Sequence, residues 1–138
     1  LWREEAITFS GEAHTITDAG LNPLPPNKNI PIWLGGMAPQ VIERVGRLAD
    51  GWFPFVNKGL SEQIQQVQES AKRAERNPAD IGIECIIPSD TDPDRIKALR
   101  DMGVTHVAMV TMNQGLRDPA AHVDAITRAR DNLSTLLD

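Results

Sequence analysis

The sequence predicts an α/β fold of four parallel strand–helix units, arranged as half of a (β/α)8 barrel. Short apolar runs alternate four times with segments whose apolar residues recur at helical spacing. The runs are apolar at most positions, which is typical of parallel strands that helices cover. The chain has 138 residues, whereas a closed barrel usually needs roughly 250, so these units are too few to close one.

The residues before these units have a different character. Residues 7–17 alternate loosely between apolar and polar, which predicts a short hairpin. Residues 18–31 contain four prolines, and proline fixes φ and lacks the N–H that a sheet ladder needs. We therefore expect an ordered, extended loop there and not a domain boundary. The chain, 1–138, is then one partial domain, with a hairpin and proline-rich loop at 1–29 and the four units at 30–138.

Each of the first two units starts with a short apolar strand. We expect strands near 31–35 and 51–55, the first of which ends at Gly35-Gly36. We expect the helix of the second unit to begin with Ser61 as its N-cap. The helical spacing is that of Val41, Val45, Leu48 and Ala49 in the first unit and of Leu60, Ile64, Val67, Ala71 and Ala74 in the second.

The third and fourth units repeat the pattern, with strands expected near 81–87 and 104–111. Asp92 and Asp118 each precede a proline, which is the pattern of a helix that starts with proline at its first position. Gly103 ends the third helix. The apolar positions are Ile96, Leu99 and Met102 in the third helix and Val123, Ile126, Leu133, Leu136 and Leu137 in the fourth.

Two other architectures compete with the half-barrel. A small open sheet also fits the alternation, but a flavodoxin-like sheet usually has about five strands and the sequence supplies four. The chain begins at Leu1-Trp2, with no initiator Met and no secretory signal, which we interpret as the end of a helix whose start is missing. The alternative is a trimmed but complete small domain.

Composition excludes several classes of function. Hydrophobic residues make up 41% and charged residues 24%, as in a globular protein and not a disordered one. The net charge of −5 argues against nucleic acid as a partner, because binding it requires clustered Lys and Arg. No run approaches the roughly 18 apolar residues of a membrane span. The single cysteine excludes an internal disulfide and indicates a reducing, cytoplasmic compartment.

The most informative segment is Gly35, Gly36, Met37 and Ala38, which lies between an expected strand and an expected helix. Two glycines let the backbone approach an anion closely, and the N–H groups at the start of the helix face it. A phosphate, or a cofactor that carries one, is the natural ligand. The segment matches neither the G-x-G-x-x-G fingerprint nor a P-loop, so a tight turn without a ligand is the alternative.

The other polar candidates do not assemble into a site. Alternation along the third expected strand turns Glu84 toward the barrel interior, as a structural or a site residue, and buries Cys85 against the helices. His106 lies at the start of a strand, and barrel chemistry occurs at the carboxyl ends, so we expect a structural role. His14 lies in the hairpin, and we expect His122 to face solvent. One cysteine and three histidines make no zinc site, and no catalytic triad emerges.

Four segments together carry a resemblance to a known family. They are Phe9-x-Gly11, Gly20-Leu21-Asn22-Pro23-x-Pro25, Ile30-Pro31-Ile32-Trp33-Leu34-Gly35-Gly36 and Arg47-x-Ala49-Asp50-Gly51-Trp52-Phe53. This pattern resembles the luciferase-like monooxygenase superfamily, and it is most similar to the branch of deazaflavin (F420)-dependent oxidoreductases. The resemblance covers nearly the whole chain, but only the carboxyl-terminal portion of a family member.

The resemblance implies the second half of a (β/α)8 barrel that holds F420 or FMN at the carboxyl ends of its strands. In such proteins the Gly-Gly turn contacts the cofactor phosphate, a role that falls here on Gly35, Gly36, Met37 and Ala38. We expect Gly36→Val to weaken cofactor binding with little loss of folding. The first half of the barrel, which usually supplies the proton-handling side chains, is absent, so the resemblance names no catalytic residue.

The function implied is that of a fragment of a flavin- or deazaflavin-dependent oxidoreductase. Its reaction on a small-molecule substrate would be hydride transfer or monooxygenation. The alternative is a non-catalytic half-barrel that binds a phosphate-bearing ligand or assembles with a partner. A half-barrel leaves two open sheet edges, so we expect a homo-oligomer and no activity from the isolated chain.

Overall fold

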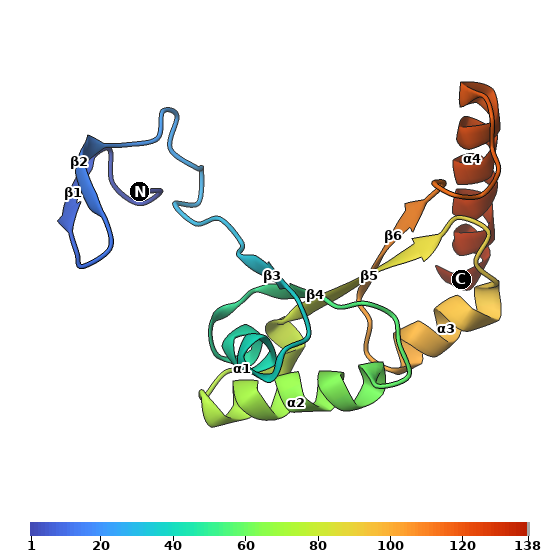
Figure 1. Ribbon diagram of the computed structural model, residues 1–138, viewed down its shortest axis with the longest axis horizontal. Helices are drawn as coiled ribbons and strands as arrows, with labels where there is room; N and C mark the ends of the chain where they lie inside the picture. The colour runs from blue at the N-terminus through green and yellow to red at the C-terminus, as the bar shows by residue number, and fades with distance from the viewer. Residues whose placement is uncertain (138) are drawn as a thin grey trace. The chain divides into compact units, whose positions relative to one another are not determined.

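The computed structural model describes residues 1–137, with side chains as far as Ser134. The side chains of Leu136 and Leu137, expected on the last helix, therefore lie outside the described residues, as does Asp138. The chain divides into two compact units, Leu1–Ile32 and Trp33–Asp138, and each is described by itself (Figure 1). No helix among the described residues is both long and apolar enough to cross a membrane.

The first unit contains the expected hairpin. Strand β1 (Ile7–Ser10) pairs antiparallel with β2 (Thr15–Ala19), and the N–H of Gly11 donates to the carbonyl of His14 at 2.9 Å to close the turn. The second strand extends two residues beyond the expected end of the hairpin. The proline-rich loop follows, without regular structure up to Ile32.

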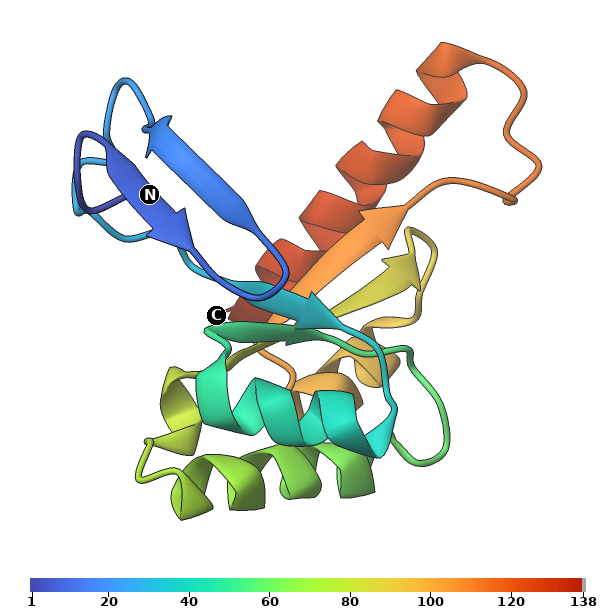
Figure 2. The same ribbon diagram turned by 60° about the vertical axis from the view of Figure 1, so that its left-hand side comes forward.

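The second unit is a parallel sheet of four strands whose order in space is their order in the chain, β3-β4-β5-β6. This confirms the expected four strand–helix units. A helix follows each strand, and α1 and α2 pack side by side on one face of the sheet (Figures 1 and 2). The elements are β3 (Trp33–Gly35), α1 (Pro39–Leu48), β4 (Gly51–Phe53), α2 (Leu60–Arg73), the 3₁₀ helix η1 (Pro78–Asp80), β5 (Gly82–Pro88), α3 (Pro93–Asp101), β6 (His106–Val110) and α4 (Pro119–Leu137).

The sheet has one covered face and one open face. Along β5, Ile83 and Cys85 are buried in the core against the helices, whereas Glu84 is half-buried and Ile86 is 58% exposed. This alternation confirms the expected orientation of the third strand. The core continues across the helix-facing side through Val45, Ala49, Trp52, Leu60, Ile64, Val67, Ala71 and Leu99, all of which are 2% exposed or less.

On the open face, Trp33 forms the floor at the amino ends of the strands. Its indole lies across Gly51 and Gly82, and a β-carbon at either glycine would overlap the ring. The ring of Phe53 lies 5.1 Å from the indole, and His106 meets it edge-on at 5.4 Å. The glycines of β4 and β5 therefore provide the space that the tryptophan of β3 occupies, and His106 packs as a structural residue would.

Two helix starts follow the sequence closely. The carboxylate of Asp92 accepts the N–H of Asp94 at 2.7 Å, and that of Asp118 accepts the N–H of Ala121 at 2.9 Å. Each aspartate thus supplies an acceptor to an N–H group that the first helical turn leaves without a partner. The proline after each aspartate occupies a position where the missing N–H costs nothing.

The expected N-cap at Ser61 is wrong. Helix α2 begins at Leu60, and Gly59 is the residue before it. The amide oxygen of Asn57 accepts the N–H of Gly59 at 2.6 Å, and the carbonyl of Asn57 accepts the N–H of Leu60. This Asn-centred turn directs the backbone into the helix two residues early, so Ser61 lies inside the first turn.

The open edges of this sheet lead to a prediction about association. Among the described strands, β3 pairs only with β4 and β6 only with β5, so each has one edge without a partner strand. Val123 and Ile126 on α4 are 64% and 52% exposed. Unpaired edges and exposed apolar patches recruit other chains. We expect the 138-residue chain to sediment as a dimer or larger species.

The double variant Val123→Lys/Ile126→Lys should shift the sedimentation of the chain toward the monomer. A matched control is Gln65→Lys/Gln66→Lys, which adds the same charge to exposed positions of α2 and should leave association unchanged. A chain that sediments as a monomer at every concentration would contradict this prediction.

Candidate functional site

The candidate site is the turn between β3 and α1, where the sequence places Gly35, Gly36, Met37 and Ala38. Gly35 is the last residue of β3, and Gly36 has a φ of 110°, a conformation that favours glycine. Ala38 is the extended residue before α1, and no side chain caps the N–H groups there. The four residues therefore lie at the carboxyl end of β3, between the strand and α1.

Two side chains from the next unit hold this turn. The indole N–H of Trp52 donates to the carbonyl of Gly36 at 2.7 Å, and the indole is fully buried. The amide of Asn57 donates to the sulfur of Met37 at 3.1 Å. Sequence reasoning missed both contacts. A signal existed for Trp52, since a buried indole N–H usually has a hydrogen-bond acceptor.

The start of α1 carries no negative charge of its own. Its first turn has no acidic residue, whereas the first turns of α2 and α3 contain Glu62 and Asp94. The partial positive charge at the amino end of α1 is thus left without a carboxylate. A β-carbon on Gly35 would meet no atom within 4 Å, so open space lies beside the turn. The arrangement suits an anion held by backbone N–H groups.

The remaining sequence candidates lie elsewhere. Cys85 is fully buried, and burial, followed by the nearby charge of Glu84, raises the pKa of its thiol. His14 is exposed on the hairpin unit. The expectation that His122 faces solvent is wrong: it is half-buried, and its Nδ1 lies 2.7 Å from the hydroxyl of Thr111. Thr111 follows β6 directly, and the hydrogen bond draws the imidazole toward it. The described residues contain no cluster of metal-ligating side chains.

A polar cluster that the sequence did not predict joins the ends of β5 and β6. Gln114 accepts the hydroxyl of Ser89 at 2.8 Å and donates to Asp90 at 3.1 Å and to the carbonyl of Val110 at 3.2 Å. A cavity of about 370 Å³ lies beside it, lined in part by Arg128. These internal partners satisfy the hydrogen bonds of the Gln114 amide, so the cluster links the loop after β5 to the loop after β6.

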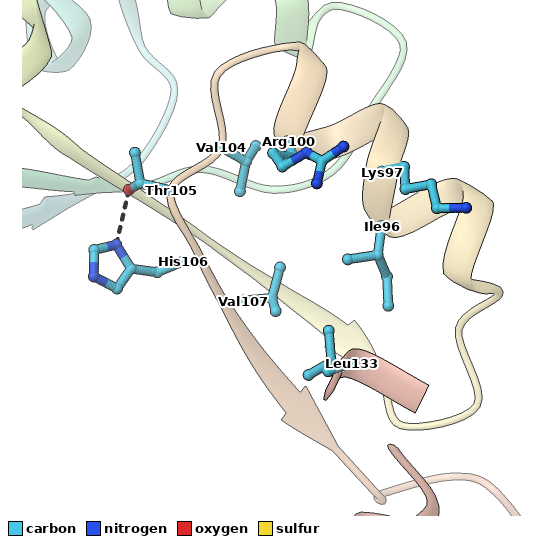
Figure 3. Close-up of a pocket in the computed structure, with 8 residues that line it drawn as sticks. All are labelled: Ile96, Lys97, Arg100, Val104, Thr105, His106, Val107 and Leu133. Atoms are coloured by element: carbon cyan, nitrogen blue, oxygen red, sulfur yellow. Dashed lines mark hydrogen bonds between the residues drawn. The ribbon is translucent and has the colours of Figure 1, made fainter. Parts of the chain in front are cut away.

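A smaller cavity, of about 150 Å³, lies between α3, the start of β6 and α4 (Figure 3). Ile96, Val107 and Leu133 converge on it, whereas His106 points to the other side of its strand and meets the hydroxyl of Thr105 (Figure 3). The cavity is on the helix-covered side, at the amino end of β6. Its lining is mainly apolar, although Lys97 and Arg100 contribute to it, and it lies away from the carboxyl ends of the strands.

The family model for luciferase-like monooxygenases matches residues 1–134. The chain belongs to this family. Within it, the chain is similar to F420-dependent glucose-6-phosphate dehydrogenases, with 34% identity to that of Rhodococcus erythropolis over 68% of this chain and 29% of the relative. Identity to that of Intrasporangium calvum is 30%, over 97% of this chain and 40% of the relative. The chain thus spans well under half the length of these curated relatives.

Solved structures show the same family fold. An F420-dependent secondary alcohol dehydrogenase, in complex with an F420–acetone adduct, matches with a TM-score of 0.56 at 22% identity, over 97% of this chain and 42% of that one. The monooxygenase RslO1 from Streptomyces bottropensis also gives 0.56, at 17% identity, over 99% and 39%. At identities this low, the matches show the fold alone. That fold is a (β/α)8 barrel, of which this chain contains four strand–helix units.

The single cysteine permits a direct test of the pKa at Cys85. Because burial and Glu84 both raise it, the thiolate absorbance should appear at higher pH in the folded chain than in urea. Glu84→Gln should lower the pKa of the folded thiol only part of the way toward its ordinary value, because burial is the larger cause. Equal titration curves in the two states would show that the thiol is not buried.

Proposed function

We propose that this chain is part of an oxidoreductase that uses F420 or FMN to act on a small molecule, by hydride transfer or monooxygenation. In this proposal, Gly35, Gly36, Met37 and Ala38 hold the cofactor phosphate. The observation that carries it is the turn itself, in which a left-handed glycine leads from a strand into a helix with no acidic residue in its first turn. Membership of the family and the F420-dependent relatives support it.

The residues present fit a phosphate. Gly35 leaves space open beside the turn, and no side chain caps the start of α1. Because Pro39 has no N–H and the N–H of Val41 donates to the carbonyl of Ala38 at 2.8 Å, the donors proposed for the phosphate are those of the turn residues and of Gln40. The side-chain hydrogen bonds to the turn come from Trp52 and Asn57, neither of which ionises. The turn therefore offers positive potential without a competing carboxylate, and we assign it to binding and orientation and not to proton transfer.

When bound, the cofactor would supply the redox chemistry, and the protein orients it and excludes competing reactions. On the open face of the sheet, Phe53 and Ile86 are 38% and 58% exposed. These side chains offer an apolar surface, which in the closed barrel would keep water from the reacting atoms. We also propose that the protein is cytoplasmic and assembles as a homo-oligomer, on the strength of its single buried cysteine and its open sheet edges.

The structure changes which glycine best tests this proposal. Gly36→Val was expected to leave folding nearly intact, but the φ of 110° makes any side chain there strained, so stability would fall as well. Gly35 has no such constraint, and a side chain there would extend into open space. A substitution at Gly35 thus separates ligand binding from folding.

We expect Gly35→Val in the complete protein to raise the dissociation constant for F420 or FMN about tenfold, with a melting temperature close to that of the wild type. The reason is that the new side chain would fill the space that the phosphate needs. Fluorescence titration measures the dissociation constant of each cofactor. Ala98→Val, on an exposed part of α3, is the control and should change nothing.

Three outcomes would count against the proposal. Unchanged affinity in Gly35→Val would remove the phosphate from this turn. A wild-type protein that binds neither cofactor would remove the proposed function. Binding of cofactor without turnover on any substrate tried would favour a non-catalytic half-barrel that binds a phosphate-bearing ligand.

A further inference from the structure

We infer that Trp52 is a positioning residue for the cofactor phosphate, because it sets the direction in which the N–H of Met37 points. The inference rests on the proposed function of the β3–α1 turn and adds a residue outside it. Trp52 lies on β4, sixteen residues beyond the carbonyl that it binds.

The indole is held firmly. Trp52 is fully buried on the helix-facing side of the sheet, and its backbone pairs in register with Leu34 of β3 and Ile83 of β5. Its N–H donates to the carbonyl oxygen of Gly36 at 2.7 Å, at the short end of the range for such bonds. The orientation of this side chain is thus determined by the core and not by the turn.

This hydrogen bond determines the orientation of a whole peptide group. The peptide between Gly36 and Met37 is planar, and in a trans peptide the carbonyl and the following N–H point in opposite directions. Since the carbonyl of Gly36 points at the buried indole, the N–H of Met37 points away from the core. That N–H is one of the donors assigned to the phosphate.

The opposite orientation is unfavourable on both sides of the peptide. If the peptide flipped, the indole N–H of Trp52 would lose its acceptor in a fully buried position, where an unpaired polar group is costly. The carbonyl of Gly36 would then turn its partial negative charge toward the anion. The φ of Gly36, at 110°, is the backbone conformation that accompanies the observed orientation. The donor is thereby preorganised before any ligand arrives.

If the role of Trp52 were purely structural, a different result would follow, and ligands with and without the phosphate distinguish the two cases. FMN and riboflavin share a ring system and differ by one phosphate. F420 and the same deazaflavin without its phosphate-bearing tail form a second pair. Loss of a positioning residue should weaken binding of the phosphorylated member only. General loosening of the fold should weaken both members of a pair equally.

The test is Trp52→Phe in the complete protein, titrated by fluorescence with both members of each pair. We expect the dissociation constant of the phosphorylated ligand to rise about tenfold and that of its phosphate-free partner to change less than about twofold, which corresponds to one charge-assisted hydrogen bond. Trp33→Phe is the matched control, since Trp33 packs on the open face, over Gly51 and Gly82, and should leave the ratio unchanged.

A second variant covers the case in which phenylalanine leaves a gap in the core. Trp52→benzothienylalanine keeps the shape of the indole and removes only the N–H, so it should reproduce the loss of phosphate preference in a stable protein. Equal weakening of both ligands, or no change in either, would overturn the role of Trp52. A wild-type protein with no preference for the phosphorylated ligands would instead overturn the proposed function of the turn.

Discussion

The hydrogen bond from the indole of Trp52 to the carbonyl of Gly36 connects the hydrophobic core to the turn between β3 and α1. The donor is the indole of Trp52, a core residue with no exposed surface. The other end is the turn that opens the start of α1. A glycine turn on its own has many accessible conformations, because glycine lacks a β-carbon. A rigid donor in the core restricts those conformations, and the packing of the core therefore determines the geometry of a turn at its edge.

The two ends of α1 differ in how their terminal backbone groups are satisfied. At its carboxyl end, the guanidinium of Arg76 donates to the carbonyls of Gly46 at 2.8 Å and Ala49 at 2.7 Å, which satisfies groups that a helix end leaves without partners. At its amino end, no side chain caps the helix and no acidic residue lies in the first turn. A charged side chain therefore satisfies the carboxyl end of α1, whereas no side chain satisfies the amino end. Such asymmetry is expected of a helix whose amino end meets an anionic ligand.

The helices of this unit cover only one face of the sheet, and the other face carries a layer of aromatic side chains. On the open face, Trp33 fills the space above Gly51 and Gly82, and Phe53 and His106 pack around it. That layer has the character of a barrel interior, in which inward-pointing side chains fill the centre. The solved structures show the same backbone fold in proteins more than twice as long.

The sequence by itself determined the alternation of strands and helices, the two faces of β5 and the helix starts at Asp92 and Asp118. These features depend on residues close together in the chain, so periodicity and local capping reveal them. It also pointed to the Gly-Gly turn, whose role as a phosphate site stays a proposal. The early start of α2 is also set locally, because Asn57 lies two residues before Gly59, whereas the expected cap was Ser61. Tertiary structure alone decided that His122 turns toward Thr111. It alone decided which way the turn at Gly36 faces, because its hydrogen-bond partner comes from another strand and no local pattern encodes that pairing.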